Sequence, residues 1–303
     1  MENQNLFSRF LQKYLSNKDI RSFKENYFYY IFYRIIRRFL SGNIKVKICN
    51  FFINASTNKN NMSNALLNKC YFGDEKILAT IKKISDHKKI FLLDCGSNYG
   101  FYSFYIASLS ADNQVLAFEA SPRTSNTFKV NLELNNFKNI DHRNLAIHEI
   151  SGKFVSFYER FNDWESSVTH NNFKNNKMVT VETTTIDKEL LNKNLSNFSV
   201  VIKLDIEGNE FNAIQGGFEI ITKYEPLIII ELSRYNLNNK TYNFNFFRKF
   251  LNETKYKIYD DKFIQVNIET LIDKINNLDS SHQTIGNYLL FKDSSYIHRK
   301  LIN

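Results

Sequence analysis

The turn after residue 93 constrains the fold of this chain more than any other feature of its sequence. Residues 90–93 form a short apolar run, IFLL, typical of a buried strand in a parallel sheet. The sequence DCGSNYG follows, and residues 101–109 then carry a helical pattern. In a parallel sheet, a glycine-bearing turn from strand to helix lies at the carboxyl end of the strand, where ligands bind. The segment therefore predicts an α/β sheet with a binding site at that edge.

Strand-like and helix-like segments alternate from residue 90 onward. Such alternation is typical of a mostly parallel sheet with helices on both faces, so we expect a Rossmann-like α/β domain over residues 89–303. The expected strands are residues 90–93, 114–118, 142–147, 153–158, 178–184, 200–204, 227–231 and 288–291. The expected helices are residues 101–109, 122–135, a segment that ends near residue 224, and residues 244–251.

Residues 1–88 predict a separate N-terminal extension that is mainly helical and carries no catalytic motif. The net charge of +9 is concentrated there, because residues 1–90 hold 17 Lys and Arg against 6 Asp and Glu, whereas the rest of the chain holds 23 against 25. A basic arm favours an anionic neighbour, such as a membrane surface, an acidic glycan or nucleic acid. A solvated face in a composition rich in Lys and Asn accounts for the same charges.

The stretch 27–40, YFYYIFYRIIRRFL, is amphipathic if it is helical. One face would carry Phe28, Ile31, Phe32, Ile35, Ile36 and Phe39, and the other Tyr27, Tyr30, Arg34, Arg37 and Arg38. An apolar face opposed by Arg and bordered by Tyr suits peripheral contact with a membrane interface. The same pattern suits a helix that packs on its own domain or in a dimer.

The cysteines favour a reducing compartment. Cys49, Cys70 and Cys95 are odd in number and have no CxxC spacing, so they indicate neither a disulfide framework nor a zinc site. The first residues, MENQNLFSRF, lack the pattern of a secretory signal, and no apolar run approaches the roughly 18 residues that span a bilayer. We expect a cytoplasmic protein, with a peripheral position at the inner face of a membrane as an open alternative.

The second expected strand leads to Glu119, which lies 25 residues after Asp94. An acid at this place can accept hydrogen bonds from both ribose hydroxyls of a nucleoside cofactor. The turn has the spacing GxxxG, with Asn98 where a dinucleotide fingerprint has its second glycine, and Asp94 would repel a pyrophosphate. S-adenosylmethionine suits the turn better, because it carries a sulfonium and an ammonium group. A purely structural turn is the alternative.

Several segments, in order, resemble the FkbM family of S-adenosylmethionine-dependent methyltransferases. The most specific is VVIKLDIEGNEFNAIQGG at residues 200–217. The others are FLLDCGSNYGFYS, VLAFEASP, NLELNN, NLAIHE, TTTID and PLIIIEL, and together they cover residues 90–232; NYLLFK is similar to the family's last strand. The resemblance implies a class I methyltransferase fold with a mostly parallel seven-stranded sheet. The resemblance does not extend to residues 1–88, so it says nothing about their fold or function.

The resemblance also implies which residues bind the cofactor. They would be Gly96, Asn98 and Gly100 at its methionine end, Glu119 at its ribose, and Asn144 and Ala146 near its adenine, and the charge argument adds Asp94 beside its positive groups. The family's usual turn has the form DxGAN. Cys95 and Ser97 are small replacements in that turn, so the departure is slight.

Methyl transfer from a sulfonium needs an acceptor that is close, aligned and dry, and a hydroxyl attacks better when a base removes its proton. The sequence LDIEGNE places Asp205, Glu207 and Glu210 after the fourth central strand, at the ligand-binding edge. Asp205 and Glu207 are the candidates to orient or deprotonate the acceptor. Glu210 suits the start of a helix, where the dipole favours a carboxylate, and Glu207 could serve there instead.

The polar stretch NDWESSVTHNN contains a further candidate base, His170. It also holds Trp164, whose ring could stack on a sugar in a loop that covers the acceptor, although a solvated loop is the alternative. The six histidines show no metal-ligand spacing. A metal site could be made from Asp205, Glu231 and another carboxylate, but nothing in their spacing requires one. We therefore expect no metal.

The sequence thus predicts an O-methyltransferase that acts on a hydroxyl of a saccharide, a glycolipid or another small metabolite. Two alternatives stay open. The basic arm would suit a nucleic-acid methyltransferase or an RNA-binding module, although the tetrapeptides NPPY and DPPY used in base methylation are absent. The stretch 27–40 would suit a membrane-associated protein that binds S-adenosylmethionine without catalysis.

Overall fold

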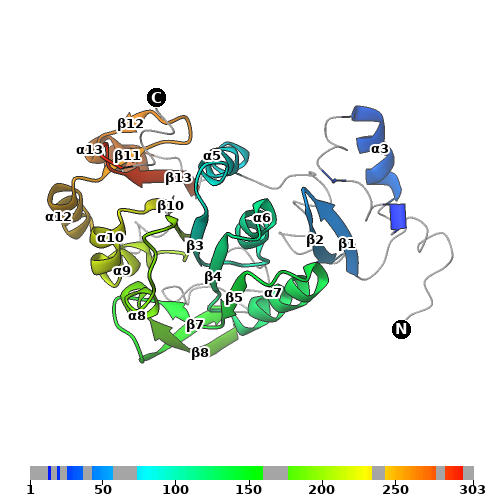
Figure 1. The fold of residues 1–303 in the computed structure, drawn as a ribbon, viewed down its shortest axis with the longest axis horizontal. Coiled ribbons are helices and arrows are strands. Elements are labelled where there is room, and N and C mark those ends of the chain that lie inside the picture. Colours follow the sequence, from blue (N-terminus) through cyan, green and yellow to red (C-terminus); the bar gives the residue numbers. More distant parts are fainter. Residues whose placement is uncertain are drawn as a thin grey trace.

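A central eight-stranded sheet organises the chain (Figure 1). The computed structural model describes residues 13–14, 19–20, 26–36, 43–56, 74–159, 177–233, 243–277 and 284–295. The strand order is β12-β11-β13-β10-β9-β3-β4-β5. The strands are β3 (Ile90–Cys95), β4 (Gln114–Phe118), β5 (Ile140–Arg143), β9 (Ser199–Leu204), β10 (Leu227–Ser233), β11 (Lys257–Tyr259), β12 (Gln265–Val266) and β13 (Thr284–Phe291).

The sheet is mostly parallel, as the sequence predicts. Strands β10, β9, β3, β4 and β5 pair in parallel, and β13 lies antiparallel between β10 and β11. Every residue of β3 and β9 is buried, because helices cover both faces of the sheet. Six of its strands overlap expected segments, whereas β11 and the two-residue β12 were not expected and make the sheet eight-stranded instead of seven-stranded.

Two groups of helices cover the two faces (Figure 1). One face carries α5 (Glu75–Ser85), α6 (Phe101–Leu109) and α7 (Pro122–Asn135). The other carries α8 (Ile186–Leu190), α9 (Glu210–Gln215), α10 (Phe218–Tyr224), α12 (Phe244–Thr254) and α13 (Ile268–Asn276). Separate apolar clusters lie under the two groups. Pro122 occupies the first turn of α7, as expected, and the Ser121 hydroxyl caps that helix by accepting from the Thr124 amide at 3.1 Å.

A second, three-stranded sheet has the order β6-β8-β7. It consists of β6 (Ala146–Ile147), β7 (Phe154–Glu159) and β8 (Lys177–Thr184). The single strand expected at residues 142–147 is therefore wrong. The chain leaves the main sheet after Arg143, and Ala146 then pairs with Thr183 of β8. The expected pair at 153–158 and 178–184 is confirmed as the antiparallel pair β7 and β8.

The N-terminal segment contains a β-hairpin that the helical expectation missed. Its strands are β1 (Asn43–Ile48) and β2 (Phe51–Ser56), and the alternation in NIKVKI buries every second side chain. The outer edge of β2 binds α7, because the Asn131 and Asn135 side chains accept from the Asn54 and Phe52 amides at 2.8 and 2.6 Å. With the Asn135 amide also donating to the Phe52 backbone oxygen, three long-range hydrogen bonds join the hairpin to α7.

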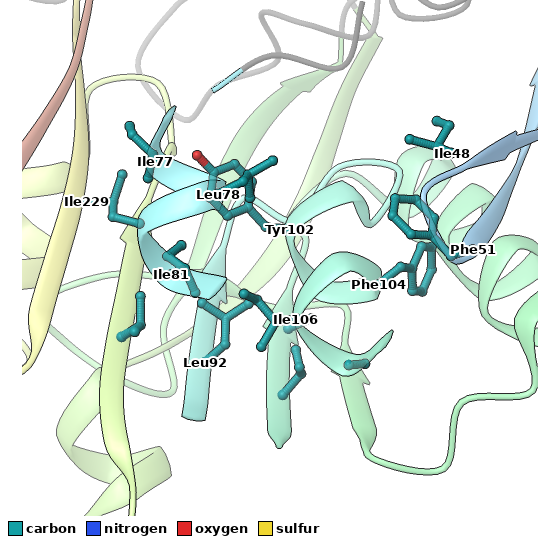
Figure 2. Packing of buried hydrophobic residues seen from close by; sticks show 14 of the residues in the cluster. Ile48, Phe51, Ile77, Leu78, Ile81, Leu92, Tyr102, Phe104, Ile106 and Ile229 are labelled. Carbon is teal, nitrogen blue, oxygen red and sulfur yellow. The ribbon is translucent and has the colours of Figure 1, made fainter. Parts of the chain in front are cut away.

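The hairpin and α5 share one apolar cluster with the main sheet. Figure 2 shows Phe51 beside Phe104 of α6, with ring centroids 6.0 Å apart. It also shows Ile81 of α5 between Ile77 of the same helix and Leu92 of β3. The division of the chain at residue 88 stays a prediction. The apolar cluster contains residues from both sides of that position. Helix α3 (Tyr27–Ile36) agrees with the helical expectation there, and residues 37–40 lie outside the described residues.

Candidate functional site

The carboxyl ends of β3, β9 and β10 bring four charged side chains to one face of the sheet. Side chains alternate along a strand, and Leu92 and Val201 face the cluster under α5 and α6. Asp94 and Lys203 lie two positions further on, opposite each other in the register of β3 and β9. They therefore face α5 and α6 as well. Asp205 follows β9, and Glu231 lies on β10.

The turn between β3 and α6 has the backbone that its glycines predict. Gly96 and Gly100 have φ of +80° and +95°, and Asn98 also adopts a left-handed conformation with φ of +48°. A Cβ atom on Gly96 would lie 1.8 Å from the backbone oxygen of Asp205. This glycine is thus required because the loop after β9 crosses it, which is a tertiary reason that the turn motif alone does not contain.

Glu119 lies directly beside the glycine turn, as the spacing predicts. Its carboxylate accepts from the backbone amides of Asn98 and Ser121, both at 2.9 Å. Burial raises the pKa of Glu119 to about 7, against the opposing effect of these two amides. The carboxylate is therefore held at the carboxyl end of β4, where the expected ribose would lie.

Asn144 and Ala146 occupy different surroundings. The Asn144 amide donates to the backbone oxygens of Glu119 and Ala120 at 2.7 and 2.9 Å, so it braces the loop that carries the acid. The Ala146 side chain is buried in the small cluster of the second sheet with Phe157 and Val181. Contacts of either residue with adenine stay predictions.

Asp94 is almost completely buried at the end of β3. Its Oδ2 accepts from the Ser103 hydroxyl at 2.6 Å, and its Oδ1 has no hydrogen-bond partner among the described residues. Burial raises the pKa of Asp94, and the nearby Lys203 ammonium opposes that effect. The hydroxyl of Ser97, in the same turn, is also buried without a hydrogen-bond partner in this part of the chain. These polar atoms fit a cationic, hydrogen-bonding ligand such as the methionine end of S-adenosylmethionine.

Lys203 is a functional candidate that the sequence interpretation missed. Its side chain is only 6% exposed, and its ammonium lies 2.7 Å from Asp205 Oδ2 and 5.0 Å from the centre of the Tyr102 ring. Burial alone would lower the pKa of Lys203. The carboxyl groups of Asp205, Asp94 and Glu231 raise this pKa by more than burial lowers it, so the lysine is charged. A lone charge in the apolar strand SVVIKL was the signal that could have identified it.

Glu231 lies beside Asp205, because Leu204 pairs with Ile230 in the register and each acid is the next residue along its chain segment. The negative charge of Asp205 and burial raise the pKa of Glu231 well above its ordinary value. Burial also acts to raise the pKa of Asp205, but the Lys203 ammonium and the neighbouring Glu231 carboxyl outweigh it and lower that pKa. The structure therefore joins two acids that are separated by 26 positions in the sequence.

Asp74 and Asn287 extend this group of polar side chains. The Asp74 carboxylate accepts from the Tyr102 hydroxyl at 2.9 Å and from the Asn287 amide at 2.8 Å. Asn287 lies on β13, opposite Glu231 in the register. Neither residue belongs to a local motif, since segments more than 200 residues apart meet here.

The loop after β9 carries two glutamates, Glu207 and Glu210, in different surroundings. Glu210 begins α9, as expected, and its carboxylate accepts from the amides of Ile206 and Gly208 at 3.0–3.1 Å. Glu210 thus stabilises the loop, and burial raises its pKa to about 7. Glu207 lies in the turn before the helix with φ of +53°, and its charge acts on Glu231. The interpretation of Glu207 as a helix start is therefore wrong, and its catalytic role stays a prediction.

His170 and Trp164 lie outside the described residues, in the connection from β7 to β8. In the part of the chain that the structure describes, no three His, Cys, Asp or Glu side chains are grouped to hold a metal ion. Among the same residues, no helix combines the length and the apolar character needed to cross a membrane.

Comparison with known proteins gives matches over the same region. The family model described as the methyltransferase FkbM domain matches residues 94–258. The protein Methyltransferase 1 of Beauveria bassiana (strain ARSEF 2860) is 26% identical over 145 residues, which are 42% of this chain and 57% of that protein.

Two solved structures are similar at lower levels. Methyltransferase FkbM from Methylobacillus flagellatus KT is 15% identical with a TM-score of 0.39, covering 76% of this chain and 52% of that one. TYW2 of P. horikoshii, solved in complex with MeSAdo, is 12% identical with a TM-score of 0.41, covering 83% and 72%. These structural likenesses are too remote to transfer a substrate or a mechanism. The chain spans just over half of the Beauveria and Methylobacillus proteins.

Proposed function

Because the chain belongs to the FkbM family of S-adenosylmethionine-dependent methyltransferases, we propose that it transfers a methyl group to a hydroxyl of a saccharide, a glycolipid or another small metabolite. The observation that carries this proposal is the position of Asp205. Its side chain is 34% exposed, at the carboxyl edge of the sheet, and lies beside the buried Lys203 ammonium and the half-buried Glu231 carboxyl. A carboxylate that is open on one side and held on the other suits an acceptor hydroxyl.

The glycine turn and its acids would hold the cofactor. When bound, S-adenosylmethionine supplies an activated methyl group on a sulfonium. Asp94, with its free buried oxygen, would face the positive end, and Glu119 would accept from the ribose. Gly96, Asn98 and Gly100 would let the backbone approach closely. The chain's own contribution is then to position the two reactants, to exclude water and to accept a proton.

Calorimetric titration with S-adenosylmethionine tests the cofactor site. We expect the wild type to bind and Glu119→Ala to bind at least tenfold more weakly, because charged hydrogen bonds contribute about 1.5–3 kcal/mol. Glu133→Ala, an exposed acid on α7, is the matched control and should bind like the wild type. If the wild type does not bind, the proposal is abandoned.

Methyl transfer from labelled cofactor to a panel of sugars, glycolipids and small alcohols tests the reaction. We expect transfer to a hydroxyl, and Asp205→Asn should lower kcat by about 10²–10⁴, the range for a general base. Asp112→Asn, on an exposed turn, is the control. Transfer to nucleic acid instead, with an affinity that falls steeply with salt, would favour the alternative of a nucleic-acid methyltransferase.

We also propose that α3 makes peripheral contact with an anionic lipid surface. Phe28, Ile31, Phe32 and Ile35 lie on one side of this helix and are exposed, Phe28 by 79%, whereas Tyr30 packs against the core. The excess of Lys and Arg over residues 1–90 favours anionic lipid as the partner of this face.

Flotation with phosphatidylserine-containing vesicles and with neutral vesicles tests this contact. Binding to the anionic vesicles should fall at least tenfold in Phe28→Ser/Ile31→Ser and persist in Val130→Ser, which alters an exposed apolar residue of α7. A dimer that dissociates in the double variant, with no flotation of the wild type, would contradict the proposal.

A further inference from the structure

We infer that Asp205 and Glu231 act as one proton-sharing pair which receives the acceptor proton, and that Lys203 is the residue that positions this pair. The inference rests on the proposed function and deepens it, because Asp205 would no longer act alone. It assigns roles to Glu231 and Lys203, which lie on two neighbouring strands of the sheet.

The register places the two carboxyl groups next to each other. Two ionised carboxylates at neighbouring strand ends repel each other, so the pair is favoured when one of them holds a proton, in agreement with the raised pKa of Glu231. The register explains why they meet. Leu204 pairs with Ile230 across β9 and β10, and the next residue on each strand is one member of the pair.

Lys203 holds the pair from the buried side. Its ammonium lies 2.7 Å from Asp205 Oδ2, and Asp94 across the register adds a second negative charge. A carboxylate that is largely removed from water is disfavoured without a cation, and this ammonium compensates the charge of Asp205. The cation also leaves the outer side of Asp205 free, since that side chain is 34% exposed.

Two coupled acids form a better base than one acid beside a lysine. The pair releases its protons in two steps, and the doubly ionised pair binds a proton more tightly than Asp205 could by itself. This agrees with the raised pKa of Glu231 and the lowered pKa of Asp205. A base works best when its pKa lies near the working pH. The pKa for loss of the second proton from the pair lies closer to neutral pH than the pKa of Asp205 alone would.

The step balances without another reactant. A lone pair of the acceptor oxygen forms the new O–CH3 bond, and the C–S bond breaks with its electrons passing to the sulfur. The O–H proton passes to a carboxylate oxygen of the pair. It then leaves through the exposed side of Asp205 to solvent.

Carbon-13 NMR of the Asp carboxyl groups tests the pair in the protein alone. The Asp205 signal is assigned by its loss in Asp205→Asn and followed from pH 2 to 9. We expect two inflections in the wild type, the upper one at least one pH unit above the ordinary Asp range. Glu231→Gln, which is nearly isosteric, should leave one inflection at acidic pH. A single acidic inflection in the wild type would overturn the inference.

A double variant isolates the role of Lys203 by comparison with Glu231→Gln. Lys203→Met/Glu231→Gln removes the ammonium from that background, and circular dichroism checks that the variant folds. The Asp205 inflection should lie at least one pH unit higher than in Glu231→Gln, because the ammonium no longer favours the carboxylate. An unchanged inflection would reject the role of Lys203.

The pH profile of kcat/KM then separates this inference from the proposed function. In the wild type, the rate should rise with pH through the upper inflection of Asp205. In Glu231→Gln, the rising part of the kcat/KM profile should move to acidic pH. The maximal kcat/KM should fall roughly tenfold to a hundredfold, within the range for an impaired general base. Asp112→Asn should match the wild type. No transfer by the wild type to any acceptor rejects the proposed function, whereas transfer with an unmoved rising part in Glu231→Gln rejects the pair.

Discussion

The two faces of the central sheet are built from the same strands but differ at the carboxyl edge. Toward α5 and α6, the last side chains are Asp94, Lys203, Asp205 and Glu231. Toward α9 and α12, they are Cys95, Leu204, Ile230 and Leu232, all buried. Because strand side chains alternate, each charged residue has an apolar neighbour on the opposite face. One strand end can therefore supply a charged site and an uninterrupted core at once.

The largest effect on stability is expected at Gly96, because the backbone of the loop after β9 crosses this glycine at the charged edge of the sheet. In Gly96→Ala, the new Cβ would lie 1.8 Å from the Asp205 backbone oxygen, so the loop after β9 must move. We expect a loss of about 4 kcal/mol or more in the free energy of unfolding, measured by urea denaturation.

Gly152→Ala is the control for that substitution. Gly152 also has a left-handed φ, +77°, but no atom lies within 4 Å of its Cβ position. Its cost should be about 1 kcal/mol, from the backbone conformation alone. Equal costs at both glycines would mean that the crossing of the two loops does not matter.

A truncation on the apolar face should separate stability from chemistry. Leu204→Ala removes a fully buried side chain and should cost about 2–5 kcal/mol in unfolding free energy. The folded fraction should keep its affinity for S-adenosylmethionine, because the charged face is unaltered. Leu191→Ala, which is 40% exposed, should change the stability by less than about 1 kcal/mol.

Glu119 should make cofactor affinity depend on pH. Its pKa is raised to about 7 by burial, so the carboxyl is protonated below that pH and can no longer accept from both ribose hydroxyls. Affinity should fall as the pH decreases from 8 to 6, by about tenfold per unit below 7. In Glu119→Gln, calorimetry should show weaker binding without this dependence. A variant with the wild-type pH dependence would assign it to another group.

The smallest effect is expected at the edge strand β5. His142 stacks on Phe128 at 4.1 Å, and neither ring nitrogen has a hydrogen-bond partner in the described residues. Burial lowers the pKa of His142 to about 4, so the unfolded chain takes up a proton between pH 6.5 and 4 that the folded chain refuses. Stability is lost as the pH falls through that window.

His142→Phe should therefore remove part of the acid sensitivity. We expect a gain of about 1 kcal/mol at pH 7, because two buried polar atoms disappear, and a larger gain at pH 5. Urea denaturation at both values measures it. His87→Phe, on an exposed turn, should change neither value.

Local patterns were sufficient where a residue's neighbours in sequence decide its structure. The turn after β3, the acid after β4 and the start of α9 at Glu210 follow from short motifs, and the structure confirms their positions. The strands β3 and β9 were evident from their apolar runs. Patterns failed at residues 43–56, where the hairpin depends on Asn131 and Asn135, more than 70 positions away.

The sequence by itself determined the fold class and the edge of the sheet at which the site lies, because apolar periodicity and glycine turns act over a few residues. Only the tertiary structure decided which charges meet there. Lys203 and Glu231 face Asp205 because β9 lies between β3 and β10, and Asp74 reaches Asn287 through contacts across most of the chain. Electrostatic coupling depends on distance in space, and no local pattern encodes that distance.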